Sequence, residues 1–280
     1  MKNSGKKTAI EFSLLLCTYK NDNPMHLNEC LDSILSSTIQ PSEMIIVKDG
    51  PLTQELDEVL TRTVFPFETN TIQLPNHQTQ GLARREGVLA AKHNWISLMD
   101  SDDVLVPDRF EIQLASIDEN PEIDIVGGQI AEFDTSPTKT HSVRKVPTSH
   151  TEIVSYAKKR NPFNAMTVMF KKRLALLSGN FRYFPGFEDY DLWVRMMKNG
   201  AFCQNCKEVL VYVRTGEGMY KRRRGLHYIR RELRMQILLM RTGMTTKQQF
   251  VKNLLVRIPS RLLSTRTLER LYKKFLRSRT

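Results

Sequence analysis

The sequence has no run of about 18 apolar residues, which excludes a membrane-spanning helix. Cysteine is scarce: the four cysteines in 280 residues, two isolated and two close together, form no disulfide framework and favour a reducing cytoplasm. Only a short strand-like run follows the basic N-terminus, so we expect no signal peptide. With 13 glycines and 12 prolines, the chain is also neither collagen-like nor disordered. A cytoplasmic globular protein is therefore expected.

Several motifs of well-known enzyme classes are missing. The chain contains no G-x-x-x-x-G-K-[ST] and no H-E-x-x-H, and no G-x-G-x-x-G follows its first strand-like run, which disfavours P-loop, zinc-peptidase and dinucleotide enzymes. Cys203 and Cys206 have C-x-x-C spacing, but no second pair and no nearby histidine completes a zinc site. We interpret this pair as structural.

Charge is distributed unevenly along the chain. The net charge is +12, yet residues 221–280 hold 18 Lys and Arg against two acids, a charge of +16, and the remaining 220 residues carry −4. This division predicts an acidic globular body, residues 1–220, and a basic extension, residues 221–280. The extension implies a polyanionic partner, and composition does not choose among nucleic acid, anionic lipid and a phosphorylated substrate.

The first 130 residues alternate short apolar runs with amphipathic stretches. This pattern predicts a mostly parallel sheet covered by helices, an α/β fold. The expected strands are 12–17, 44–47, 71–74 and 95–99, and the expected helices are 27–35, 52–63, 81–93 and 107–118. Further along, the patterns predict strands at 123–133, 165–170 and 209–213, a helix at 188–199, and basic helices after Gly225 that break at Gly243 and Pro259.

Polar loops follow three of these strands. They carry Thr18 and Tyr19, Asp49, and the acidic run from Asp100 to Asp103. Ligands of open α/β sheets bind at the carboxyl ends of strands, so the three loops should converge on one cleft. Carboxylates at Asp100 and Asp102 could share a divalent cation, or the run could cap the next helix; the preceding apolar strand favours a site.

Two further segments carry charged side chains at expected helix starts. Glu188 and Asp189 open the helix at 188–199. Acids in a first helical turn are stabilised by the helix macrodipole, and an acid at this position could also act as a general base. By itself this segment is typical of an ordinary helix start. Arg84 and Arg85 lie near the start of the helix at 81–93, where they could meet a phosphate or a base. Surface helices often carry arginine, so this signal is weak alone.

Taken together, these segments resemble family 2 glycosyltransferases of the GT-A fold, a Rossmann-like α/β fold, over residues 12–225. Five elements occur in the family's order: Cys17-Thr18-Tyr19-Lys20, Ile46-Val47-Lys48-Asp49-Gly50, Ala83-Arg84-Arg85-Glu86-Gly87, Leu98-Met99-Asp100-Ser101-Asp102-Asp103 and Phe187-Glu188-Asp189-Tyr190-Asp191-Leu192-Trp193. Residues 211–214 and 218–223 are similar to the corresponding segments of a bacterial branch of this family. Its members, which include amylovoran-type transferases, build exopolysaccharide, capsule or O-antigen repeat units.

The resemblance implies a nucleotide-sugar site. Thr18, Tyr19 and Asp49 would line the uracil and ribose pocket, and Arg84 would lie near the base or phosphate. Asp100 and Asp102 match the D-x-D metal motif, which places Asp100 near the ribose and Asp102 on Mn²⁺ or Mg²⁺.

The resemblance also implies the chemistry. Asp189 matches the catalytic base of the family's Glu-Asp motif, with Glu188 beside it. We expect an inverting, metal-dependent enzyme that moves one sugar from a UDP-sugar to a polyprenyl-pyrophosphate-linked oligosaccharide. Ala165 stands where relatives often carry histidine, which suggests a different acceptor. The Q-x-x-R-W motif of processive synthases is missing, in keeping with single-sugar transfer.

Two other functions would each use part of this sequence. A nucleic-acid-binding protein would use the basic extension, but no nucleic-acid motif occurs and the body is acidic, so we expect no nucleic-acid partner. An inactive transferase-like scaffold conflicts with the intact acids. In the extension, Leu268, Leu271 and Phe275 alternate with bases, a pattern typical of an interfacial helix on anionic lipid or of a solvated helix packed on the body. We expect peripheral association with the inner face of the cell membrane.

Overall fold

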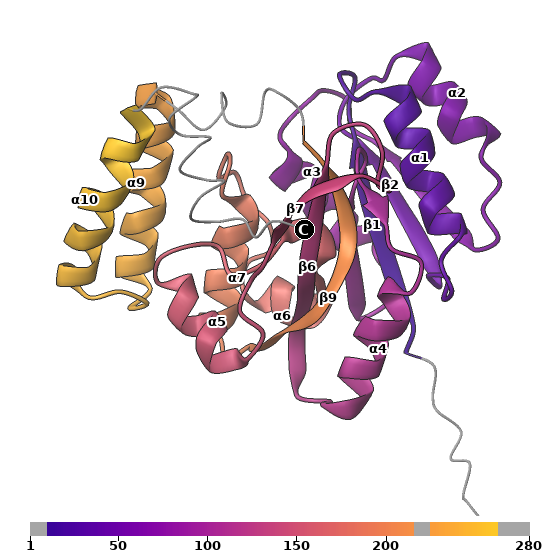
Figure 1. Cartoon of the computed structure of the whole chain (residues 1–280). Coiled ribbons are helices and arrows are strands. Elements are labelled where there is room, and N and C mark those ends of the chain that lie inside the picture. The colour runs from indigo at the N-terminus through magenta and orange to yellow at the C-terminus, as the bar shows by residue number, and fades with distance from the viewer. Residues whose placement is uncertain (1–9, 216–224, 263–280) are drawn as a thin grey trace, which may run out of the picture.

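The computed structural model describes residues 10–215 and 225–262, which form a mixed sheet between two layers of helices (Figure 1). The first half of the chain alternates strands and helices as predicted. Its elements are β1 (Phe12–Thr18), α1 (Pro24–Leu35), β2 (Glu43–Lys48), α2 (Gln54–Arg62), β3 (Glu68–Gln73), α3 (Gln80–Ala90), β4 (Trp95–Asp100), β5 (Val104–Leu105) and α4 (Arg109–Glu119).

The second half is less regular. Its elements are β6 (Ile123–Phe133), β7 (Thr140–Arg144), α5 (His150–Ala157), η1 (Ala165–Thr167), β8 (Met169–Lys171), α6 (Lys172–Leu177), α7 (Glu188–Lys198), β9 (Phe202–Arg214), α9 (Gly225–Arg241) and α10 (Lys247–Leu262). The sheet has the order β3-β2-β1-β4-β8-β6-β9-β5, with β7 beside β6. Strands β1 to β4 are parallel as predicted, and antiparallel pairs beyond β4 make the whole sheet mixed.

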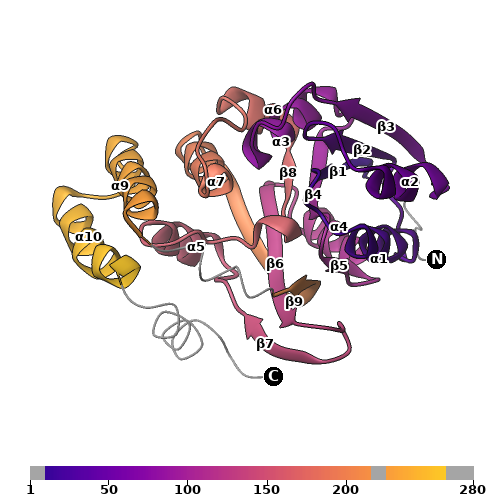
Figure 2. The ribbon, with the colours of Figure 1, turned by 90° about the horizontal axis from the view of Figure 1, so that it is seen from above.

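Burial on both faces explains why β1 is almost continuously apolar. Leu14 and Leu16 point into the core beneath α1, α2 and α4, whereas Leu15 points into the core beneath α3, α6 and α7. Figure 2 shows these two helix layers on opposite sides of the strands. Each apolar side chain buried in this way contributes about 1.5–3 kcal/mol relative to an exposed position, so the central strands hold the cleft residues on a rigid base.

The parallel register brings three strand ends to one edge of the sheet. Cys17 of β1 lies opposite Val47 of β2 on one side and opposite Asp100 of β4 on the other. The loops that follow these strands therefore start within one strand spacing of each other, about 5 Å. The predicted convergence of the three polar loops is confirmed.

Three predicted elements differ in the structure. Residues 165–170 are a 3₁₀ turn followed by a short strand, because the Thr167 hydroxyl donates to the Asn164 carbonyl (2.7 Å) and turns the chain. The strand predicted at 209–213 begins already at Phe202, so Cys203 and Cys206 are buried strand residues. Finally, α10 continues through Pro259, which lies near its end and removes only one backbone donor.

Helix α9 packs on α7 and is shown beside α10 at the edge of the molecule (Figure 1). Tyr228, Met235 and Leu239 of α9 join Tyr190 and Val194 of α7 in one buried cluster. The fully buried Glu232 joins the two terminal helices by pairing with Arg257 (2.7 Å) and Arg261 (3.0 Å) of α10. The predicted boundary between residues 220 and 221 therefore lies before α9, and α9 contributes side chains to a buried cluster that also contains residues of the body.

The described structure covers only part of the basic extension. Residues 221–224 and 263–280 lie outside the described residues, and so does the predicted interfacial pattern of Leu268, Leu271 and Phe275. Among residues 10–215 and 225–262, no helix combines the length and apolar character needed to cross a membrane.

Candidate active site

The loops after β1 and β2 are joined by hydrogen bonds. The amide of Asp49 donates to the carbonyl of Thr18 (2.8 Å), and the Asp49 carboxylate accepts from the amide of Gln78 (2.8 Å). The other carboxylate oxygen of Asp49 lies 2.9 Å from Nδ1 of His77. Asp49 is therefore a buried carboxylate that orients the segment before α3.

Tyr19 forms an aromatic pair with the same histidine. The Tyr19 and His77 rings stack with centroids 5.4 Å apart and an interplanar angle of 26°. His77 was not predicted, because the six histidines are scattered and only the fold brings this one to Asp49 and Tyr19. Stacked rings at a strand end offer a flat apolar surface, the kind of surface on which a nucleobase stacks.

Asp22 links the loop after β1 to the acidic loop after β4. Its carboxylate oxygen Oδ2 accepts hydrogen bonds from the hydroxyls of Thr18 (2.9 Å) and Ser101 (2.6 Å) and from the amide of Tyr19 (3.2 Å). Burial raises the pKa of Asp22, and these donors oppose the increase. The sequence prediction missed this residue, although an aspartate four positions after Thr18 in a tight loop is suited to such a role.

Arg84 of α3 and Asp100 at the end of β4 form a largely buried ion pair. Nη2 of Arg84 lies 2.6 Å from Oδ1 of Asp100, which also accepts from the side-chain amide of Gln80 (3.0 Å). Burial alone would lower the pKa of Arg84, but the carboxylate of Asp100, with further help from Asp189 and Glu188, raises it. Arg84 is thus a permanent positive charge near three carboxylates from two different segments, Asp100 at the end of β4 and Glu188 and Asp189 at the start of α7.

Asp102 has a different environment from Asp100. Its side chain reaches solvent, yet partial loss of hydration, followed by repulsion from Asp100 and Asp22, raises its pKa to about 6. Asp103 is buried and accepts from the amide of Arg214 (3.0 Å). The alternative that this acidic run caps the next helix is wrong, because α4 begins at Arg109 with Asp108 at its N-cap.

Asp100 and Asp102 suit a divalent cation that takes only one or two of its ligands from the protein. Because Asp100 is engaged by Arg84 and Gln80, Asp102 is the carboxylate of the D-x-D pair that is more open to a metal ion. The described residues contain no group of three or more His, Cys, Asp or Glu side chains able to enclose a cation. The arrangement suits Mg²⁺ or Mn²⁺ held by one or two carboxylates and completed by phosphate oxygens and water.

The second acidic pair begins α7. Oδ2 of Asp189 accepts from the side-chain amide of Asn161 (2.7 Å), and Oδ1 accepts from the amide of Tyr190 (2.8 Å). The neighbouring Glu188 has a carboxylate oxygen, Oε2, that is buried without a hydrogen-bond partner, and burial together with Asp189 raises its pKa. Asn161 was also missed, since nothing in its local sequence indicates a contact with a residue 28 positions away.

Close packing of α3 against the start of α7 joins the two acidic segments. A Cβ atom at Gly81 would lie 2.8 Å from Cβ of Glu188 and 3.0 Å from the carbonyl oxygen of Arg182, so only glycine permits this approach. The third acid of the segment, Asp191, has a structural role: it is fully buried and paired with Arg182 and Arg195. The fold thus brings Glu188 and Asp189 toward Arg84 and Asp100, as the predicted site requires.

Known proteins resemble this chain over most of its length. A family model described as "Glycosyl transferase family 2" matches residues 13–177. An uncharacterized glycosyltransferase of Haemophilus influenzae is 38% identical, covering 96% of this chain and all of its own length (100%). The amylovoran biosynthesis glycosyltransferase AmsE of Erwinia amylovora is 32% identical over 94% of this chain and 98% of its own.

A third relative comes from Escherichia coli, a UDP-Gal:alpha-D-GlcNAc-diphosphoundecaprenol beta-1,3-galactosyltransferase, with 33% identity over 95% of this chain and 97% of its own. Among solved structures, Staphylococcus aureus TarS 1-349 in complex with UDP-GlcNAc has a TM-score of 0.66 and 15% identity, covering 95% of this chain and 73% of that one. A Pyrobaculum calidifontis mannosyltransferase with GDP-Man and Mn²⁺ has a TM-score of 0.63 and 16% identity, over 92% and 72% of the two chains. These structures share the GT-A-like fold.

Proposed function

The chain belongs to glycosyltransferase family 2, and on that premise we propose that it transfers a single sugar from a UDP-sugar to a polyprenyl-diphosphate-linked oligosaccharide during bacterial surface-polysaccharide synthesis. The observation that carries this proposal is that two acidic segments, distant in sequence, both lie close to Arg84. Asp100 ends β4 and Asp102 lies in the loop that follows, Glu188 and Asp189 begin α7, and the contact of α3 with α7 at Gly81 holds the two segments close.

The donor occupies the strand-end cleft in this proposal. The Tyr19–His77 stack takes the uracil ring, and Thr18 and Asp49 face the nucleoside. A uridine donor is supported by the Escherichia coli relative, whose name includes UDP-Gal, and by the TarS complexes with UDP-GlcNAc and UDP. Arg84 keeps its charge in the buried pair with Asp100 and contributes positive potential toward the donor diphosphate.

Asp102, together with Asp100, would hold Mn²⁺ or Mg²⁺, and the mannosyltransferase neighbour contains Mn²⁺. When bound, the cation stabilises negative charge on the departing diphosphate. The protein contributes orientation: the Ser101 hydroxyl donates to Asp22 (2.6 Å) and Arg214 donates to the carbonyl of Asp102 (3.3 Å), so two adjacent residues of the acidic loop are held in place.

Asp189 acts as the general base. The acceptor hydroxyl oxygen forms a bond to the anomeric carbon while the bond from that carbon to the diphosphate oxygen breaks, and the hydroxyl proton moves to the Asp189 carboxylate. Asn161 and the amide of Tyr190 orient this carboxylate through both of its oxygens. Attack from the face opposite the leaving group inverts the anomeric centre, so an α-linked donor yields a β-linked product.

A donor screen tests the proposal. With Mn²⁺ and a polyprenyl-diphosphate-linked acceptor, we expect one UDP-sugar to release UDP and to lengthen the acceptor by one hexose or N-acetylhexosamine. Mass spectrometry of the lipid product measures extension of the acceptor, and an assay of released UDP measures consumption of the donor. Tight binding to DNA or RNA without turnover of any nucleotide-sugar would favour the nucleic-acid alternative, and donor binding without turnover would favour the inactive scaffold.

We also propose that residues 221–280 hold the enzyme peripherally on the inner face of the cell membrane. Each Lys or Arg near an anionic surface contributes about 1 kcal/mol. Replacing Arg270, Lys273 and Lys274 together with Gln should therefore remove most flotation with phosphatidylglycerol vesicles. Residue substitution is preferable to truncation after residue 220, because α9 covers the buried cluster on α7.

The matched control for flotation removes the same charge from exposed positions of the body. Lys139, Lys145 and Lys207 are exposed, and their replacement with Gln should leave flotation close to wild type. Equal loss of flotation in the two triple variants would show that net charge alone, and not the extension, governs binding.

A further inference from the structure

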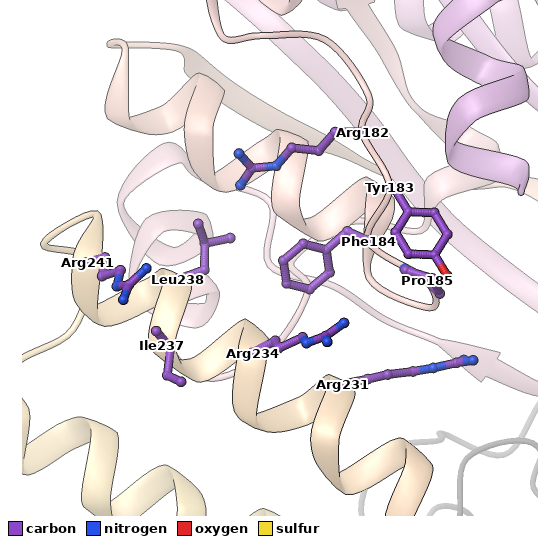
Figure 3. Close-up of a pocket in the computed structure, with 9 residues that line it drawn as sticks. All are labelled: Arg182, Tyr183, Phe184, Pro185, Arg231, Arg234, Ile237, Leu238 and Arg241. Atoms are coloured by element: carbon purple, nitrogen blue, oxygen red, sulfur yellow. The ribbon is translucent and has the colours of Figure 1, made fainter.

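A pocket of about 400 Å³ lies outside the strand-end cleft, between the segment that precedes α7 and one side of α9. Figure 3 shows the side chains of the two segments facing one another across it, with Phe184 between them. The lining residues are Arg182, Tyr183, Phe184, Pro185, Arg231, Arg234, Ile237, Leu238 and Arg241. The pocket thus combines four arginines with aromatic and aliphatic side chains, and none of its lining residues within the described part of the chain is acidic.

The positive charge of the pocket is largely uncompensated. Arg182 pairs with the buried Asp191 beneath the pocket, where its Nε donates over 2.8 Å. Arg234 and Arg241 are exposed, and among residues 10–215 and 225–262 neither forms an ion pair with a carboxylate. Arginines that share a concave site attract phosphate groups, because the guanidinium fork matches two phosphate oxygens.

The apolar part of the pocket indicates more than a free phosphate. Phe184, Ile237 and Leu238 are only partly buried, so they offer hydrocarbon surface next to the guanidinium groups. A ligand that satisfies both kinds of lining is amphipathic, with a polyanionic head and a hydrocarbon chain. An allylic diphosphate has both parts, whereas a nucleotide has the phosphates but no hydrocarbon chain.

The pocket is adjacent to the proposed general base. Its lining segment continues through Gly186 directly into Glu188 and Asp189 at the start of α7. Arg231 of α9 lies over this connection, since its Nη1 is 3.4 Å from the place where a Cβ of residue 186 would be. A diphosphate held by α9 would therefore leave its attached sugar on the Asp189 side of the active site.

We propose that this pocket binds the diphosphate and the first isoprenoid units of the lipid-linked acceptor. The inference rests on the proposed function for its choice of acceptor class, and it assigns recognition of the lipid diphosphate to Arg234 and Arg241. The donor diphosphate, by contrast, belongs to the strand-end cleft at Asp102 and Arg84. The two diphosphates of the reaction therefore have separate sites on either side of Asp189.

Binding of farnesyl diphosphate to the full chain, measured by titration calorimetry, tests this assignment. We expect saturable binding that is weakened about tenfold or more, or about 1.4 kcal/mol, in the Arg234→Gln/Arg241→Gln variant. The matched control, Arg230→Gln/Lys252→Gln, removes the same charge from exposed positions of α9 and α10 that do not line the pocket, and should change affinity less than about twofold.

Competition distinguishes the possible occupants. UDP with Mn²⁺ and short-chain phosphatidylglycerol below its micelle concentration should each fail to displace farnesyl diphosphate. Displacement by UDP would place the probe in the donor cleft, displacement by phosphatidylglycerol would make the pocket a site for membrane headgroups, and equal losses in the two double variants would reduce the effect to net charge. Each of these results overturns the assignment.

The same titrations keep this inference apart from the proposed function. If the wild-type chain binds farnesyl diphosphate but not UDP, the donor assignment is wrong and the pocket stands. If it binds UDP with Mn²⁺ but not farnesyl diphosphate, the donor assignment stands and the pocket is wrong. Thermal melting of both double variants checks that they fold.

Discussion

Replacing Asp189 with Asn should reduce the rate of sugar transfer by about 100- to 10,000-fold, the usual contribution of a positioned general base. Asn is nearly the same size and can still accept from the amide of Tyr190, so α7 should begin as before. It cannot take the acceptor proton at neutral pH. Transfer to the lipid-linked acceptor, measured with saturating donor, gives the change in kcat.

The nearby Asp191 provides the contrast for this variant. Asp191 is fully buried and pairs with Arg182 and Arg195, so Asp191→Asn should lower the melting temperature clearly, whereas Asp189→Asn, which loses only the hydrogen bond from Asn161, should lower it much less. Turnover in Asp189→Asn above about a tenth of wild type would rule out the base assignment. A large drop in its melting temperature would instead indicate a structural role for Asp189.

Replacing Asp102 with Asn should lower metal-dependent transfer by at least about 100-fold, because the leaving diphosphate loses several kcal/mol of charge stabilisation. The free protein should at the same time be equally or more stable to heat. Asp102 has a folded-state pKa of about 6, above its ordinary value of 3.8, so its ionised form is disfavoured by folding. Above about pH 6 the ionised carboxylate opposes folding, and Asn removes that repulsion.

The raised pKa also predicts a pH dependence of donor binding. As the pH falls through about 6, Asp102 of the free protein takes up a proton and loses its affinity for the cation. UDP binding in the presence of Mn²⁺, titrated between about pH 5 and 8, should weaken toward the acid end in the wild type. In Asp102→Asn this Mn²⁺-dependent part of binding should be missing across the range.

Asp108→Asn is the control for Asp102. Asp108 is exposed, lies at the N-cap of α4 and makes no side-chain cap hydrogen bond, so this variant should keep wild-type transfer. Transfer by Asp102→Asn at a rate near that of Asp108→Asn would contradict the metal-site assignment. A clearly lower melting temperature for free Asp102→Asn would contradict the electrostatic explanation of its pKa.

Much of the fold was predictable because its signals are local. The strands around Leu15, Ile45 and Ile96 are apolar on both faces, which is typical of strands buried in a parallel sheet. The second half was less predictable because its strands depend on partners far along the chain. The turn at 165–167, for example, depends on Asn164 and Thr167, whose side chains reach the carbonyl of Gly128.

The sequence by itself determined the parallel first half of the sheet, the strand-end positions of Thr18, Asp49, Asp100 and Asp102, and, through its resemblance to a family, the class of enzyme. Only the tertiary structure decided how those side chains are engaged: Asp100 is paired with Arg84, Asp102 is the more open carboxylate, and Asn161 holds Asp189.

The basic extension shows the same division. Its excess charge is evident in composition, but the burial of Glu232 and the arginine-lined pocket depend on how α9 packs against α7 and α10. The physical reason is that hydrophobic periodicity and turn residues act over a few positions, whereas ion pairs and pockets join residues that are distant in sequence and meet only after the layers pack.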